Sequence, residues 1–170
     1  MDFEIRPAVP ADHARIGEIA VDAYRDAGLL PEGADYAVRL RDAAGRSQHC
    51  DLIVARDPAT EQVLGSVSVC LPGSAMSEIA AGDHELEFRM LSVALDAQGR
   101  GVGAALVMAC VDEARRRGCE SVVLSVADRG RLTSAQRLYL RLGFRWMPER
   151  DWFPVPGVRL LAMRLPLTED

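Results

Sequence analysis

The chain has 170 residues, of which 49% are hydrophobic and 26% are charged, and its formal net charge is −5. This length suits one domain that buries its own core, and we expect residues 1–170 to form it. No apolar run approaches the ~20 residues of a membrane-spanning helix. The acidic balance argues against nucleic acid as the main partner and mildly favours a cationic substrate.

The four cysteines, at positions 50, 70, 110 and 119, form no CxxC pair and show no metal-ligand spacing. We therefore expect no metal site. The opening residues, MDFEIRP, contain no cationic segment leading into an apolar one, so we expect no secretion signal. Reduced cysteines and the absence of such a signal favour a cytoplasmic protein.

The first predicted element is a strand at residues 3–6, where apolar and polar residues alternate until Pro7 and Pro10 end it. Apolar residues then recur at helical spacing over residues 11–27. Gly28 follows as the expected end of this helix.

A second, weaker helical pattern covers residues 33–46. The apolar loop before it, residues 29–31, either packs on the core or lines a pocket. Two β-rich runs, 51–56 and 63–71, predict a hairpin. Residues 72–83 contain glycine, proline and serine without periodicity, which indicates a surface loop.

A central strand around Glu87 to Val93 is followed by a buried helix that begins near Gly101. Three arginines occupy the last turn of this helix and Gly118 ends it, as expected at a helix carboxyl end. The run Ser121–Ala127 predicts a further strand, so strand, helix and strand form one parallel βαβ crossover.

The last third of the chain predicts a short helix that stops at Gly143, followed by two closing strands. These strands cover residues 144–147 and 158–165, with residues 148–157 as a loop between them. The whole pattern predicts an α+β (α/β) fold with a mixed, largely antiparallel sheet and flanking helices.

Glycines occupy alternate positions 99, 101 and 103 at the start of the buried helix. Each costs roughly 0.5 to 1 kcal/mol against alanine in a helix, so a structural requirement must favour them. The first turn of a helix has N–H groups without partners and a partial positive charge, which together bind phosphate. Arg100 adds a full positive charge beside this predicted anion site.

Two other interpretations of this stretch exist. Gly99, Gly101 and Ala104 satisfy the dinucleotide fingerprint GxGxxA, with Asp128 at a suitable distance for a ribose. In a dinucleotide fold, however, the strand runs directly into the first glycine, whereas five residues separate Val93 from Gly99. The glycines could also form a tight turn and nothing more.

The segment LSV, a turn and QGRGVGAAL resembles the QxxGxG or QxxGxA motif of the GCN5-related N-acetyltransferases. A second segment, Ala135 to Phe144, is similar to the pattern AxxLYxxxGF of that family. Leu132 departs from the family, which often has asparagine there, and Thr133 or Ser134 could cap the helix instead.

The resemblance implies that acetyl-coenzyme A is the cosubstrate. In this family the loop and helix start hold the pyrophosphate, and the preceding strand pairs with the pantetheine arm. The implied cofactor-binding residues are Leu91, Ser92, Val93, Gln98, Gly99, Arg100, Gly101, Val102, Gly103 and Ala104.

The resemblance also implies two catalytic residues. Glu87 stands where members with the pattern ELRxLxV often carry a general base; otherwise it is a surface carboxylate paired with Arg89. Alternation along a strand places Glu87, Arg89 and Leu91 on one face unless a bulge intervenes. Tyr139 corresponds to the usual proton donor to the leaving thiolate, or is a packed aromatic residue. His84 is an alternative base.

These features predict an N-acetyltransferase that moves acetyl directly from acetyl-coenzyme A to an amine. A sensor that binds acyl-coenzyme A without catalysis would keep the glycine loop but would not need Tyr139 or a base. The sequence identifies neither the amine, which is a small molecule or a peptide, nor the choice between a monomer and a homodimer. We expect no membrane or nucleic-acid partner.

Overall fold

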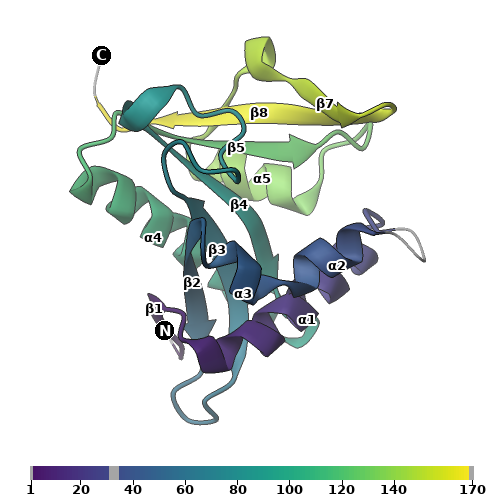
Figure 1. The fold of residues 1–170 in the computed structure, drawn as a ribbon, viewed down its shortest axis with the longest axis vertical. Helices are drawn as coiled ribbons and strands as arrows, with labels where there is room; N and C mark the ends of the chain where they lie inside the picture. Colours follow the sequence, from purple (N-terminus) through teal and green to yellow (C-terminus); the bar gives the residue numbers. More distant parts are fainter. Residues whose placement is uncertain (1, 31–34, 169–170) are drawn as a thin grey trace.

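In the computed structural model, which describes residues 2–30 and 35–168, eight strands of the described chain form one sheet (Figure 1). Its strand order is β1-β2-β3-β4-β5-β8-β6, and β7 pairs with the beginning of β8. Every neighbouring pair is antiparallel except β4 and β5. The strands are β1 Glu4–Pro7, β2 Cys50–Arg56, β3 Val63–Cys70, β4 Glu85–Val93, β5 Ser121–Ala127, β6 Arg145–Trp146, β7 Trp152–Val155 and β8 Val158–Pro166.

The predicted mixed sheet with one parallel crossover is thereby confirmed. Helices cover both of its faces: α1, α2 and α3 lie against one side of the β2 to β4 part, and α4 lies against the other (Figure 1). The helices are α1 His13–Asp26, α2 Tyr36–Arg41, α3 Ala43–Arg46, α4 Val102–Arg116 and α5 Ser134–Arg141. All three predicted glycine stops are confirmed, because Gly28, Gly118 and Gly143 have positive φ values of 72°, 72° and 98° just after α1, α4 and α5.

The prediction of one helix over residues 33–46 was wrong. Asp42 separates α2 from α3 with φ −82° and ψ 62°, and its carboxylate accepts a hydrogen bond from the Gly45 N–H at 2.9 Å. This capping bond stabilises a new helix start where a longer helix would otherwise continue. In the apolar loop before α2, Leu30 is buried with Leu40 in a small cluster. That loop therefore packs on the core, while Pro31 lies outside the described residues.

The prediction that residues 148–157 are a loop was also wrong, because Trp152 to Val155 form β7. β7 pairs with β8 through Trp152 opposite Leu160, and the Trp152 indole donates a hydrogen bond to the Ser125 hydroxyl at 3.2 Å. β7 contains Pro154, and proline is tolerated in an edge strand. The pairing that stabilises β7 depends on tertiary contacts, so the local pattern did not reveal it.

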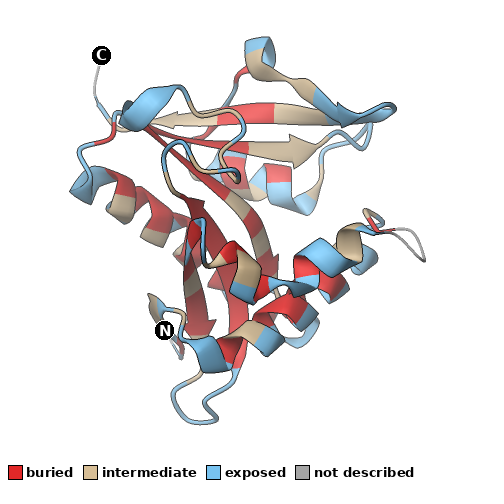
Figure 2. Cartoon of the chain, viewed as in Figure 1, coloured by how far each residue is buried: buried red, intermediate tan, exposed pale blue. Residues whose placement is uncertain are grey.

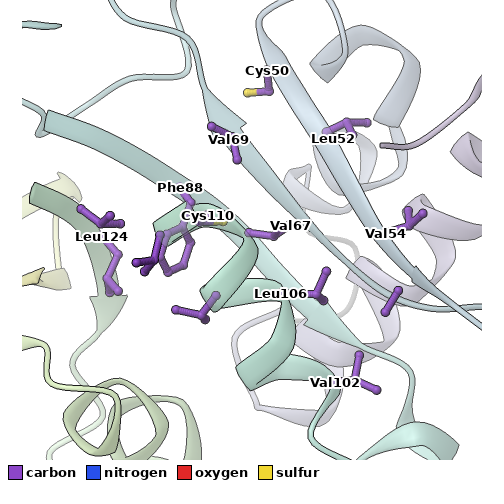
Figure 3. Packing of buried hydrophobic residues seen from close by; sticks show 14 of the residues in the cluster. Cys50, Leu52, Val54, Val67, Val69, Phe88, Val102, Leu106, Cys110 and Leu124 are labelled. Carbon is purple, nitrogen blue, oxygen red and sulfur yellow. The ribbon is translucent and has the colours of Figure 1, made fainter. Parts of the chain in front are cut away.

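The core between α4 and the sheet fixes where α4 begins. Val102 and Leu106 of α4 are buried beside Val67 of β3, as Figure 3 shows, and burial of such side chains contributes about 1.5 to 3 kcal/mol each. A Cβ on Gly65 would lie 3.0 Å from Val102 and 3.2 Å from Leu106, so the helix approaches β3 closely. The red core in Figure 2 runs through this contact. The start of α4 is therefore held near the end of β4.

The three arginines at the end of α4 all form ion pairs with carboxylates. Arg115 pairs with Asp112 at 3.6 Å, Arg116 with Glu113 at 2.6 Å and Arg117 with Asp51 at 2.6 Å. Within residues 2–30 and 35–168, none of the helices has both the length and the apolar character needed to cross a membrane.

Candidate active site

β4 and β5 pair with each other only at their amino-terminal ends and then separate. Their parallel pairing covers Glu85 to Glu87 on β4 and Ser121 to Val123 on β5, whereas β4 continues to Val93 and β5 to Ala127. In the described chain, the edge of β4 beyond Glu87 that faces β5 has no strand partner. This opening lies at the carboxyl ends of both strands, where ligands bind in many open sheets.

A β-bulge occurs in β4 within this unpaired stretch. The register with β3 shifts between Ser66 and Ser68, and Met90 has a positive φ of 55°. Met90 packs in the cluster with Leu40, on the same side as Arg89. The bulge therefore breaks the simple alternation, and Leu91 does not share a face with Glu87 and Arg89. A non-glycine residue in this conformation costs about 1 to 3 kcal/mol and is found mostly at functional sites.

The ladder between β3 and β4 shows which backbone groups face the opening. Ala94 donates its N–H to the Leu64 carbonyl at 2.8 Å, so alternation of the antiparallel pattern directs Ser92 toward its register partner on β3. The N–H groups of Leu91 and Val93 then point to the other edge. Of the three predicted strand residues, Leu91 and Val93 therefore offer N–H donors to the opening, and Ser92 is used within the sheet.

The predicted glycine turn lies between β4 and α4. Gly99 and Gly101 have φ values of 79° and 82°, and a Cβ added to either would meet no atom within 4 Å. Both glycines therefore adopt a conformation that L-residues avoid and also face open space. Gly103 differs, because its Cβ would lie 3.3 Å from Leu138 of α5, so this glycine allows close helix packing.

The start of α4 has unpaired backbone donors. Its first α-helical hydrogen bond runs from the Ala105 N–H to the Gly101 carbonyl at 3.0 Å. The N–H groups of Val102, Gly103 and Ala104 precede this bond and have no partner from the preceding helical turn, which is the arrangement that binds anions. Gln98 leads into the turn in an extended conformation. Arg100 adds a cation, although it pairs with Asp2 at 2.6 Å.

Glu87 is buried, with 2% of its surface exposed, and its carboxylate binds the loop before β4. Oε2 accepts hydrogen bonds from the backbone N–H groups of Glu78, Ile79 and Ala80 at 2.8, 3.2 and 3.3 Å, and from the Ser77 hydroxyl at 3.1 Å. All four bonds end on Oε2, and none of the described residues donates to Oε1. Glu87 is therefore not the surface partner of Arg89.

Two neighbours on the same face of β4 hold the loop as well. Glu85 accepts the Ala81 N–H at 2.8 Å, and Arg89 pairs with Glu78 at 2.9 Å. Burial raises the pKa of Glu78, although the nearby charge of Arg89 opposes this shift. Residues 72–83 are a largely exposed loop, as predicted, but its attachment to β4 was not predicted. One sequence feature indicates such an attachment: Glu87 stands between the apolar residues Leu86 and Phe88, and a charged side chain that is buried requires partners.

Tyr139 lies on α5 and is buried against two other aromatic rings. Its ring centroid lies 6.0 Å from that of Phe88 and 5.8 Å from that of Phe144. Burial raises the pKa of the Tyr139 hydroxyl, so the group carries its proton at neutral pH. The helix start is capped by Thr133, whose hydroxyl accepts the Gln136 N–H at 3.2 Å. Thr133 thus takes the capping role that the sequence left open between it and Ser134.

Two other predicted candidates lie elsewhere. His84 precedes β4 at the end where β4 and β5 are paired, so the length of β4, about 3.3 Å per residue, separates it from the glycine turn. Asp128 accepts the Gly130 N–H at 2.9 Å within its own turn. The dinucleotide interpretation is wrong, because the sheet is largely antiparallel and a 3₁₀ turn, Leu95–Ala97, separates β4 from Gly99. The described residues contain no group of three or more His, Cys, Asp or Glu side chains placed to hold a metal.

Comparison with known proteins identifies the class to which this fold and site belong. The model of the acetyltransferase (GNAT) family matches residues 10–144, and the chain belongs to this family. No curated protein matches the sequence.

Solved structures with this fold span nearly the same length. A GCN5-related N-acetyltransferase from Kribbella flavida is 28% identical, with 98% of each chain covered and a TM-score of 0.69. An inferred acetyltransferase from Salmonella typhimurium, determined with its cofactor acetyl-CoA, is 25% identical, with 100% of this chain and 96% of that chain covered and a TM-score of 0.69. A ribosomal-protein-alanine N-acetyltransferase from Brucella melitensis, at 23% identity, 96% and 99% coverage and a TM-score of 0.63, shares the fold.

The attachment of the loop to Glu87 predicts a change in local stability. Glu87→Ala removes the acceptor of three backbone N–H groups, and a hydrogen bond to a charged group contributes about 1.5 to 3 kcal/mol. Hydrogen exchange of the Glu78, Ile79 and Ala80 amides should therefore accelerate about 10- to 100-fold. Asp83→Ala, which changes an exposed acid near the same loop, is the control and should leave these amides unaffected. Unchanged exchange in Glu87→Ala would show that the carboxylate does not hold the loop.

Proposed function

We propose that this protein binds acetyl-coenzyme A across the β4–β5 opening and the glycine turn, and transfers the acetyl group to an amine. One observation carries the proposal: the unpaired edge of β4 leads directly to a turn whose glycines face open space at a helix start. The strand edge offers N–H donors to the amide groups of an extended ligand, and the helix start offers N–H donors to a pyrophosphate. Family membership and the acetyl-CoA bound to the Salmonella protein support it.

The residues of the turn fit the pyrophosphate. Gly99 and Gly101 face open space next to the start of α4, and neither carries a side chain that would reduce the room for a ligand there. Arg100 pairs with Asp2 in this structure. On cofactor binding, its guanidinium would leave Asp2 and pair with a phosphate instead. The N–H groups of Leu91 and Val93 are placed to pair with the amides of the pantetheine arm, and one of them is suited to stabilise the oxyanion of the reacting carbonyl.

The reaction needs a base because an alkyl amine with a pKa near 10.4 costs about 4 to 5 kcal/mol to deprotonate at pH 7. Glu87 lies at the last paired position of β4, where the opening begins. Its Oε2 is held by the loop, and its Oε1 is left to accept a proton. Since Glu87 is almost fully buried, we assign the transfer to a water molecule between the amine and Oε1.

The reaction also needs a proton for the leaving thiolate of coenzyme A. Tyr139 packs against Phe88, which lies at the first unpaired position of β4, so the phenol is near the opening. Its raised pKa keeps the proton in place until a thiolate forms. We therefore assign Tyr139 the role of general acid.

The acceptor is proposed as an amine of a small molecule or a peptide. The proposal takes residues 1–170 as one catalytic domain and places the protein in the cytoplasm, where acetyl-coenzyme A is a common metabolite. Incubation of the protein with acetyl-coenzyme A and a panel of small amines, amine-bearing antibiotics and peptides, followed by mass spectrometry, tests the activity directly.

Cofactor binding at the turn is tested with Gly101→Asp. The carboxylate would enter the open space proposed for the pyrophosphate, and charge repulsion should weaken coenzyme A binding by at least about tenfold. Gly118→Asp is a matched control: Gly118 has a φ of 72° and also faces open space, but lies at the opposite end of α4. Gly118→Asp therefore introduces a similar backbone strain at a position that lies outside the proposed binding site. Calorimetric affinities that are equal in the two folded variants would refute the assignment.

The role of Glu87 as a base is tested with Glu87→Gln, which keeps an acceptor oxygen for the loop but cannot take the proton. We expect kcat/KM to fall by ~100-fold or more. Exchange of the Glu78 to Ala80 amides, measured on the same variant, separates this effect from loss of the loop. A wild-type rate would leave Glu87 with its structural role alone.

The role of Tyr139 distinguishes an enzyme from a sensor. Tyr139→Phe keeps the ring against Phe88 and Phe144 and removes the proton, so turnover should drop by ~10² to 10⁴ while coenzyme A affinity hardly changes. Tyr24→Phe, which removes the hydroxyl of a half-buried tyrosine on α1, should keep turnover near that of the wild type. Equal turnover in Tyr139→Phe and wild type would exclude the acid role. No turnover in any variant with any amine, together with intact binding, would identify a sensor.

A further inference from the structure

Two cysteines lie directly opposite each other on adjacent antiparallel strands. Cys50 begins β2, Cys70 ends β3, and they are register partners. The preceding pair, His49 and Leu71, is joined by a backbone hydrogen bond of 3.3 Å, so alternation makes Cys50 and Cys70 a non-hydrogen-bonded pair. Cα atoms in such pairs are about 4.5 Å apart, within the 4.4 to 6.8 Å range of disulfides. A bond between the two sulfurs therefore requires little movement of the backbone.

The two thiols differ in acidity. The neighbouring Cys70 thiol lowers the pKa of Cys50, and the charges of Arg89 and Arg46 oppose the effect of burial. The pKa of Cys70 is raised by the neighbouring Cys50 thiol and by burial. Arg46 is itself buried, and its guanidinium donates to the carbonyls of Arg39 and Leu40 at 2.7 and 2.8 Å. Cys50 is thus the nucleophilic thiol of the pair, and Cys70 is its proton-bearing neighbour.

Cys50 lines a cavity. The cavity has a volume of about 380 Å³, and Ser47, His13 and Val69 are among its other lining residues. None of the residues proposed to bind coenzyme A or to catalyse transfer lines this cavity. The cavity beside Cys50 is therefore separate from the proposed active site, and Cys50 itself is 3% exposed.

We propose that Cys50 and Cys70 form a redox modification site, in which a peroxide converts the two thiols into an intramolecular disulfide. The Cys50 thiolate attacks one peroxide oxygen, the O–O bond breaks, and hydroxide leaves, which gives a sulfenic acid on Cys50. The Cys70 sulfur then attacks the Cys50 sulfur, the S–S bond forms, and the S–O bond breaks. The departing hydroxide takes the Cys70 proton and becomes water. Two thiols lose two electrons, and one peroxide is reduced to two waters.

The bond would form beside the proposed base, since Cys70 is also the register partner of Glu87 on β4. The other two cysteines provide an internal comparison. Cys110 is fully buried on α4, and Figure 3 shows it beside Phe88, away from Cys50. Cys119 follows α4 and contacts the Asp83 carbonyl at 3.7 Å. Burial raises the pKa of both of these thiols, so neither is expected to react first.

The test exposes the folded protein to hydrogen peroxide, blocks remaining thiols under denaturing conditions and maps the peptides by mass spectrometry. We expect a disulfide between Cys50 and Cys70 within one chain, which dithiothreitol reverses, and alkylated Cys110 and Cys119. Circular dichroism before and after treatment verifies that the protein stays folded. A disulfide that forms only after denaturation, only between chains, or at other positions would overturn the proposal, as would its absence.

Variants sharpen the result. The double variant Cys110→Ala, Cys119→Ala should form the bridge at the wild-type rate. Cys70→Ala should instead accumulate a sulfenic acid on Cys50 that dimedone traps, because the second thiol is gone. If Cys70→Ala does not fold, Cys50→Ala provides the alternative measurement, and it should leave Cys70 unoxidised under the same conditions. Oxidation of Cys70 in that variant at the rate seen in wild type would contradict the assigned order of attack. The readout is covalent, so it does not depend on whether acetyl transfer is detected.

Discussion

The site depends on the point at which β4 and β5 stop pairing. A backbone N–H inside a protein needs a partner, and the loss of β5 beyond Glu87 leaves one edge of β4 without the partner that a complete sheet would supply. The bulge at Met90 bends the strand at this place. The packing of α4 on β3 holds the glycine turn at the end of the same strand. A single discontinuity in the sheet thus brings backbone donors, the glycine turn at a helix start and a buried tyrosine to one opening.

Three charged side chains of β4, those of Glu85, Glu87 and Arg89, hold the loop that precedes this strand. Glu87 and Glu85 accept backbone N–H groups from residues 78–81, and Arg89 pairs with Glu78. An unpaired buried carboxylate would be strongly unfavourable, so the loop and the strand stabilise each other. The proposed base is therefore a structural anchor first. Replacing Glu87 with alanine would therefore release the loop as well as remove the proposed base.

Several features could be predicted from the sequence because their causes are local. Periodicity and glycine stops marked α1 and α4, and the alternate glycines marked a turn in which Gly99 and Gly101 face open space. One failure had a local cause and the other did not. Residues 33–46 have one helical pattern but form two helices, because the Asp42 side chain caps a second start. β7 contains a proline and is stabilised by β8, so its own sequence was insufficient to predict it.

The amino-acid sequence by itself determined most of the strands and helices, except β7 and the division between α2 and α3, and it determined the family pattern and the glycine turn, since each follows from spacing within a short segment. Only the tertiary structure decided where β4 and β5 separate, that Met90 forms a bulge, that Glu87 binds residues 77–80 and that Cys50 meets Cys70. These facts depend on strand register, and a shift of one residue reverses the face of every side chain. Register is fixed by packing between segments far apart in the chain, and no local pattern contains that information.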